Sequence, residues 1–267
     1  MNQVRVHLIG FALMVAPAWA DGPPAGNPAD FKLLVAGYGL AKDPVYTEEL
    51  VAISGRIYLF ASNSHEIYVI DPSKSKVDFL DLERRLQSSI TYAQIEEGQG
   101  RVRKTLAGAI EQREKSGKRA DQIEADMTRN LAEPRLKIIE EAGSGRLQLS
   151  NPSVEVIAKG DPEADPGRLD LISRCLTTIA RLGAFLTPND LPPFVEIETI
   201  AAMTGPRKLR PTEISYLYRL AGPPQKFRRT YRLVDSLTDR DREAIRRIER
   251  FRESAPIVRY EKYRKSP

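Results

Sequence analysis

Hydrophobic and polar residues alternate with a period of two between residues 31 and 82, which is the first part of the chain that can form a core. Five such segments are rich in Ile, Val, Tyr and Phe, and they predict strands at residues 31–35, 49–53, 56–60, 66–71 and 76–82. The separators are turn-formers such as Ser54-Gly55 and Asp71-Pro72-Ser73-Lys74. Because links this short join neighbouring antiparallel strands, we expect a meander.

After Gln87 the hydrophobic period lengthens to nearly four residues. Apolar residues recur on one face of an otherwise charged helix at Ile95, Val102, Leu106 and Ile110, and again, after the break at Ser116-Gly117, at Ile123, Met127 and Leu131. Two amphipathic helices, closed by Pro134, are therefore expected to follow the first meander.

A second run of strand-like segments covers residues 135–141, 146–150 and 153–159. The helix predicted over residues 168–186 is apolar on most of its circumference, which indicates burial against the sheet. Residues 196–203 predict a short helical turn, and residues 212–220 and 227–234 a last hairpin. Thr238 and Asp241 form a capping box at the start of a final helix, which Pro256 ends. Residues 257–263 are expected to add an edge strand or to stay loose.

Strand runs interrupted by segregated helices are typical of the α+β class with an antiparallel sheet. No Ser/Gly-rich or charge-rich linker divides the chain after Asp30. We expect a single α+β domain over residues 31–267, with a basic C-terminal helix. The Pro- and Gly-rich residues 21–30 are expected to form an extended leader before it.

The first twenty residues have the composition of a secretory signal peptide. A single positive charge at Arg5 precedes an apolar run over residues 8–16, followed by Pro17 and the small-residue pattern Ala18-Trp19-Ala20. The apolar run is too short to cross a bilayer, which takes roughly 20 residues. We therefore expect cleavage after Ala20, an exported protein in the periplasm or outside the cell, and no transmembrane segment in the mature chain.

Charge is distributed unevenly along the chain. The whole sequence has 41 Lys and Arg residues against 36 Asp and Glu, a net charge of +5. From Lys226 to the C-terminus there are 14 basic and 7 acidic side chains, so this region carries +7. Such an end could dock on an anionic lipid, wall polymer or protein surface, or could simply be a solvated helix face. For an exported protein, nucleic acid is not an expected partner.

Few residues could support catalysis or metal binding. Cys175 is the only cysteine, and its apolar neighbours indicate a small core residue. His7 leaves with the signal peptide, so His65 is the only histidine of the mature chain and cannot build a histidine-based metal site. The chain contains no G-x-S-x-G, Walker, G-x-G-x-x-G or H-E-x-x-H motif. We predict no catalytic, metal or cofactor residue and no cofactor.

Paired carboxylates are the one enzymatic route that the sequence leaves open. Asp71, Asp78 and Asp81 flank a hairpin, although Asp71-Pro72-Ser73 is ordinary turn chemistry. Asp161, Glu163 and Asp165 have a calcium-like spacing but lack the Gly and the closing Glu of an EF-hand loop. We expect a plain surface connector there.

The strand aromatics could line a ligand cavity or could pack in the core, and packing is the favoured interpretation. They are Tyr58, Phe60, Tyr68, Phe79, Tyr216, Tyr218 and Tyr231.

The signal peptide, the meander over residues 56–81 and the helices inserted between meanders together resemble the Lol-type periplasmic lipoprotein carriers. That resemblance implies a strongly bent, half-barrel-like antiparallel sheet of two to three meanders. In that superfamily the sheet encloses an apolar cavity, plugged by helices, that accepts acyl chains. The chain departs from the carriers in having a Pro-rich leader where they usually have a helix, and no functional residue can be transferred.

Two functions follow as hypotheses. The first is a non-enzymatic exported protein that binds a lipid or other apolar ligand in a curved sheet. The second is an envelope interaction protein that docks through its basic C-terminal region.

Overall fold

The structure is a computed structural model, and it describes residues 30–62, 64–141, 143–186, 191–220 and 222–265. The predicted signal peptide and all of the predicted leader except Asp30 lie outside these residues.

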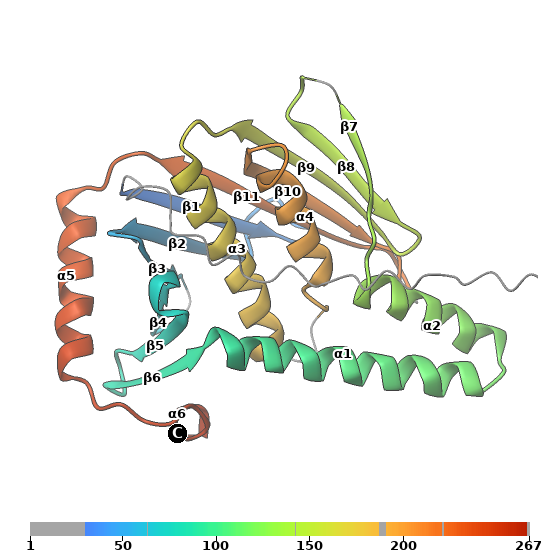
Figure 1. Ribbon diagram of the computed structural model, residues 1–267, viewed down its shortest axis with the longest axis horizontal. Coiled ribbons are helices and arrows are strands. Elements are labelled where there is room, and N and C mark those ends of the chain that lie inside the picture. Colours follow the sequence, from blue (N-terminus) through green and yellow to red (C-terminus); the bar gives the residue numbers. More distant parts are fainter. Residues whose placement is uncertain (1–29, 63, 142, 187–190, 221, 266–267) are drawn as a thin grey trace, which may run out of the picture.

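Eleven antiparallel strands form one open, curved sheet in the order β6-β5-β4-β3-β2-β1-β11-β10-β9-β8-β7 (Figure 1). The strands are β1 (Phe31–Tyr38), β2 (Tyr46–Ile53), β3 (Arg56–Ala61), β4 (Glu66–Asp71), β5 (Lys76–Asp81), β6 (Leu86–Thr91), β7 (Lys137–Glu141), β8 (Arg146–Asn151), β9 (Val154–Pro162), β10 (Leu209–Tyr218) and β11 (Gln225–Val234). The predicted α+β class with a curved antiparallel sheet is confirmed.

The sheet consists of two meanders, which are joined in the middle of the sheet by the pairing of β1 with β11. The first runs from β1 to β6 and the second from β7 to β11, and β11 pairs with β1 from Lys32 opposite Val234 to Tyr38 opposite Arg228. The β2–β3 turn is the predicted Ser54-Gly55 pair, with φ of 52° and 75°. A two-residue turn with both φ values positive matches the twist of the strands that it connects.

Six α-helices lie in the described part of the chain. They are α1 (Tyr92–Lys115), α2 (Arg119–Ala132), α3 (Pro166–Leu186), α4 (Phe194–Thr204), α5 (Asp239–Ser254) and α6 (Tyr260–Lys265), and a short 3₁₀ turn, η1, covers Pro72–Lys74. The change from strand to helix lies later than the sequence indicated, because β6 continues to Thr91. Thr91 then caps α1 in a capping box with Gln94.

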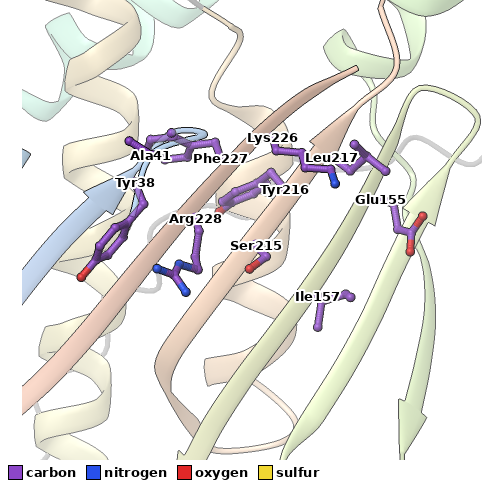
Figure 2. Close-up of a pocket in the computed structure, with 11 residues that line it drawn as sticks. Tyr38, Ala41, Glu155, Ile157, Ser215, Tyr216, Leu217, Lys226, Phe227 and Arg228 are labelled. Atoms are coloured by element: carbon purple, nitrogen blue, oxygen red, sulfur yellow. The ribbon is translucent and has the colours of Figure 1, made fainter. Parts of the chain in front are cut away.

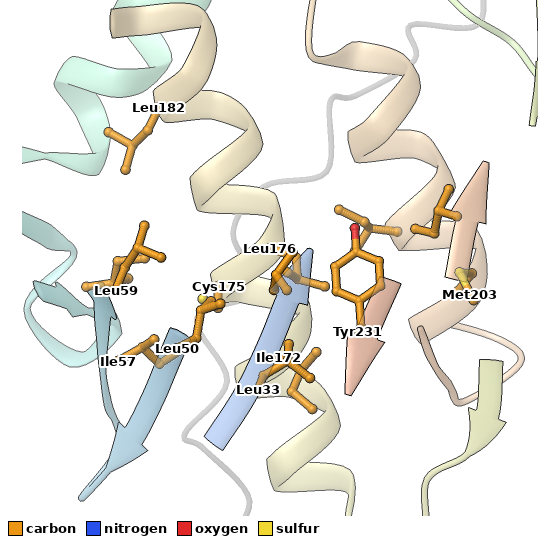
Figure 3. Close-up of a cluster of buried hydrophobic side chains, with 14 of the residues drawn as sticks. Leu33, Leu50, Ile57, Leu59, Ile172, Cys175, Leu176, Leu182, Met203 and Tyr231 are labelled. Atoms are coloured by element: carbon orange, nitrogen blue, oxygen red, sulfur yellow. The ribbon is translucent and has the colours of Figure 1, made fainter. Parts of the chain in front are cut away.

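The inner face of the sheet, defined as the face that α3 and α4 cover, carries the main core (Figures 1 and 3). Alternate residues of the strands, such as Leu33, Leu50 and Ile57, meet Ile172 and Leu176 of α3. The predicted burial of this apolar helix is confirmed. Cys175 is a free thiol on the same side of α3, only 2% exposed, and the prediction of a core cysteine is confirmed as well.

The outer face is covered in part by α5. A second, smaller core lies here, in which outward-pointing residues of β2 to β5 pack against the apolar stripe of α5. Its strand residues include Val51, Tyr58, Val69 and Leu80, and α5 contributes Ile245 and Ile248. Helix α5 also reaches β1, where Lys32 contacts Asp241 at 2.9 Å, whereas no helix of the described chain covers the outer faces of β8 to β11.

The C-terminal segment crosses the β6 edge of the sheet. The backbone N–H of Gln87 donates to Pro256, and the N–H of Val258 donates to Gln87, over 3.1 and 2.9 Å. The chain then enters α6 on the inner face, where Tyr263 is fully buried against Phe79. The expectation of an edge strand or a loose end is wrong for residues 260–263, because the aromatic side chains of this segment complete the core.

Candidate functional site

The three carboxylates that flank the β4–β5 hairpin are buried, but they do not form one group. Asp71 and Asp78 lie on the outer face and Asp81 on the inner face. Asp71 pairs with Arg56 at 2.9 Å and Asp81 with Arg84 at 2.7 Å. Asp78 pairs with Lys76 at 2.8 Å and also with Arg252. Because each carboxylate has its own cation, this hairpin lacks the geometry of paired catalytic acids.

The environment holds two of these carboxylates ionised. Burial opposes the charge of Asp71, but hydrogen bonds from Ser73 and the ion pair with Arg56 lower its pKa. Burial also opposes the charge of Asp81, and the backbone and side-chain donors of Arg84 lower its pKa. A catalytic acid needs the opposite shift, so these two residues have structural roles.

Asp78 belongs to a network that fixes α5 on the sheet. Arg252 of α5 contacts both Asp78 and Glu249, and Glu249 accepts a 2.6 Å hydrogen bond from the hydroxyl of Tyr58. Asp78 also accepts from Ser89 of β6 at 2.5 Å. The network connects β3, β5 and β6 to α5. One of the C-terminal basic residues, Arg252, therefore has a structural role within the fold.

The remaining sequence candidates occupy structural positions. His65 is exposed, with its Nε2 atom 3.8 Å from Glu83. Burial raises the pKa of the Cys175 thiol well above its usual value, which keeps the thiol protonated and a poor nucleophile. Glu163 from the acidic loop is buried and pairs with Arg168 at 2.7 Å and Arg210 at 3.6 Å. Within the described residues, no group of three or more His, Cys, Asp or Glu could hold a metal ion.

A polar cluster that the sequence did not predict lies on the inner face where β2, β10 and β11 meet α4. Its centre is Arg229 of β11, which donates from Nε to the hydroxyl oxygen of Tyr46 at 2.6 Å and pairs with Glu196 in the first turn of α4. Burial disfavours the Arg229 charge, but Glu196 together with the hydroxyls of Tyr231, Tyr46 and Tyr216 outweighs it, so the pKa of the guanidinium is raised. The ion pair connects β11 to the first turn of α4.

Aromatic rings surround this ion pair. Tyr216 stacks on Tyr218 with ring centroids 5.9 Å apart, and Phe227 lies 6.4 Å from both Tyr216 and Tyr46. The buried hydroxyl of Tyr216 has no hydrogen-bond partner among the described residues. Burial raises the pKa of Tyr216, so this hydroxyl stays protonated and can donate a hydrogen bond.

Glu48 of β2 faces the same cluster. Burial raises its pKa, Arg229 works in the opposite direction, and Glu196 adds to the rise. The cluster thus combines one ion pair, a carboxyl group whose pKa is raised and a tyrosine hydroxyl without a partner among the described residues. Chemically it can receive the carbonyl or carboxyl oxygens of a ligand whose remaining part is apolar.

A groove of about 370 Å³ lies on the opposite, outer face of β9, β10 and β11 (Figure 2). Its apolar floor includes Ile157 and Leu217, and Arg228 closes one side with its guanidinium 4.3 Å from the centre of the Tyr38 ring. Lys226 and Glu155 stand at the groove as well (Figure 2).

The cations on the outer face of β11 differ from those of α5 in whether they form ion pairs with carboxylates. Lys226, Arg228 and Arg232 form no ion pair with any described carboxylate, and the guanidinium of Arg228 lies over the Tyr38 ring. On α5, by contrast, Arg246, Arg247 and Arg250 all pair with Glu243. Lys226, Arg228 and Arg232 therefore form a row of unpaired cations on one face of a strand of the sheet.

The helices described here include none with the length and apolar character needed to cross a membrane. Comparison of the chain with known protein families finds no match, and comparison with curated proteins finds none.

Proposed function

We propose that this protein is a non-enzymatic exported protein that binds a lipid or another apolar ligand between the inner face of the curved sheet and helices α3 and α4. The observation that carries the proposal is the free, buried hydroxyl of Tyr216 beside the Arg229–Glu196 pair, at the end of an otherwise apolar face. A buried donor without an acceptor costs about 1 to 3 kcal/mol, and a ligand oxygen would remove that cost.

The ligand chain would replace the contacts that α3 now makes with the sheet. Ile172 and Leu176 occupy this position in the structure (Figure 3), so binding requires α3 to separate from β1 and β2, and α4 from β9 and β10. Apolar contacts to the ligand then stand in for those lost, at roughly 25 cal/mol per Å² of apolar surface. The resemblance to the Lol-type carriers supports the same arrangement.

Lipid extraction from the purified protein, followed by mass spectrometry, tests this proposal. We expect a stoichiometric acyl-containing ligand in protein isolated from the cell envelope, and weaker reloading of a fatty acid after delipidation in Tyr216→Phe. Tyr38→Phe makes the same change on the outer face and serves as the matched control. Protein that carries no ligand and takes up none would contradict the proposal.

A second candidate function is docking on an anionic envelope surface through the C-terminal basic region. The specific observation in its favour is the row of uncompensated cations, Lys226, Arg228 and Arg232, on one face of β11. Each basic side chain near an anionic bilayer contributes about 1 kcal/mol, and salt weakens that attraction.

Co-sedimentation with vesicles that contain anionic lipid separates the two ideas. We expect binding that falls in the variant Lys226→Gln/Arg228→Gln/Arg232→Gln and at high salt. The variant Arg246→Gln/Arg247→Gln/Arg250→Gln removes the same charge from α5 and is expected to bind as the unmodified protein does. Equal loss in both variants would show that only net charge matters.

A further inference from the structure

The two edge strands of the sheet, β6 and β7, differ in whether another segment of the chain pairs with them. At the β6 edge, the C-terminal segment pairs with Gln87, whose side-chain amide also donates to the carbonyls of Arg252 and Ala255, both at 2.7 Å. At the other edge, no segment of the described chain pairs with the free side of β7. An unpaired strand leaves backbone N–H and C=O groups available to another chain.

Strand β7 is also exposed to solvent. All five of its residues are exposed, and Ile138 and Ile139 are 37% and 49% accessible. In Figure 1 the β7–β8 hairpin projects beyond the helices that cover the rest of the sheet. A second strand could therefore approach this edge without meeting α1 to α4.

The sequence of β7, Lys-Ile-Ile-Glu-Glu, is complementary to itself in the antiparallel direction. When two copies pair about Ile139, each Ile139 faces the other, and each Lys137 faces Glu141 of the other copy. All three residues point to the outer face. Lys137 lies opposite Ser150, Ile139 opposite Gln148 and Glu141 opposite Arg146 of β8, and these alternate with the inward-pointing Leu147 and Leu149. Opposite charges and apolar pairs directly across strands each contribute roughly 0.2 to 1 kcal/mol.

We propose that β7 is a homodimerisation edge, at which two copies of this chain pair antiparallel about Ile139 and extend their sheets into one. The arrangement has twofold symmetry, so each Lys137–Glu141 contact occurs twice. Charged residues on a short edge strand ordinarily prevent association, but in this register they attract. Two paired five-residue strands bury less than the roughly 1,200 to 2,000 Å² of a stable interface, so the dimer dissociates on dilution.

Sedimentation of the full chain over a range of concentrations is the first test. We expect a monomer–dimer equilibrium that high salt weakens, and a monomer at all concentrations for Lys137→Glu and for Glu141→Lys. Mixing these two variants restores both contacts, one in its original sense and one reversed, so a heterodimer forms. Lys104→Glu, on an exposed position of α1, changes the charge equally and keeps the dimer. A monomeric unmodified protein at every concentration overturns the proposal.

Disulfide cross-linking checks the register independently of charge. The one native cysteine, Cys175, is buried and does not compete. Under mild oxidation, Ile139→Cys is expected to cross-link to its own copy, because the two residues face each other. Ile138→Cys lies opposite Glu140 of the other copy, so it cross-links far more slowly. Equal rates for the two variants contradict this register.

Discussion

Gly37 and Tyr46 face each other across the β1–β2 pair, and a Cβ atom on Gly37 would lie 2.1 Å from the Tyr46 ring. The missing side chain leaves room for the Tyr46 ring beside β1, and the hydroxyl oxygen of Tyr46 accepts a hydrogen bond from Nε of Arg229 at 2.6 Å. A glycine in one strand thus determines the position of a hydrogen-bond partner of the buried ion pair.

Gly37→Ala is expected to displace Tyr46 and to lower the free energy of unfolding by about 1 to 3 kcal/mol, the usual cost of overpacking. Chemical denaturation measures the loss. Gly108→Ala is the matched control, because Gly108 lies in α1 with open space around it. In a helix this change is expected to stabilise by about 0.5 to 1 kcal/mol, and similar losses at both sites would contradict the role assigned to Gly37.

The Arg229–Glu196 pair provides a second prediction. Arg229→Met leaves the carboxylate of Glu196 without its cation beneath α4. Because the two side chains are 23% and 17% accessible, the loss is expected to be smaller than the about 3 to 5 kcal/mol of a fully buried pair. The double variant Arg229→Met/Glu196→Leu removes both charges, so its loss should be smaller than that of Arg229→Met alone. Denaturation of the two variants and of Glu196→Leu completes the cycle. Additive losses would mean that the two residues do not interact.

Much of the fold was predictable because the two faces of the strands differ in polarity. Strand β6 was not predictable, since Gln87 and Ser88 are polar yet buried. Their side chains donate to carbonyls of residues far along the chain, including Val258. A strand that satisfies its polar groups through distant partners has no hydrophobic period of its own to recognise.

The inner polar cluster could not be predicted because its members come from strands that meet only when β1 pairs with β11. Their separation is large, as Tyr46 and Arg229 are 183 residues apart. One local signal was present. Phe227, Arg229 and Tyr231 alternate with a period of two, which places a guanidinium on the same face as two aromatic rings. The burial of Tyr216 and Tyr231 agrees with the favoured packing interpretation.

The boundary between β6 and α1 provides a third prediction. Thr91 accepts from the backbone of Gln94, and the Gln94 side chain accepts from the N–H of Thr91 at 2.8 Å. Thr91→Ala removes the cap and is expected to cost about 1 kcal/mol in the free energy of unfolding. Thr105→Ala, at an exposed position within α1, is expected to be neutral or slightly stabilising. Circular dichroism during thermal unfolding measures both, and an unchanged midpoint for Thr91→Ala would count against the cap.

Glu48 provides a pH-dependent prediction. Its pKa is raised by burial in the folded chain, so folding favours its protonated form. A raised pKa contributes stability that is fully present below the unfolded value, about 4.3, and is lost as the pH rises through the folded value. Ionised Glu48 therefore destabilises the fold at neutral pH relative to a neutral isostere.

We accordingly expect Glu48→Gln to be more stable than the unmodified protein at pH 7, with the difference shrinking as the pH falls toward about 4. Urea denaturation at several pH values measures it. Glu49→Gln removes a neighbouring carboxylate from the outer face, and it controls for the change in net charge. If Glu48→Gln and Glu49→Gln gave the same pH profile, the difference would come from overall charge, and burial beside Arg229 and Glu196 would have no measurable part in it.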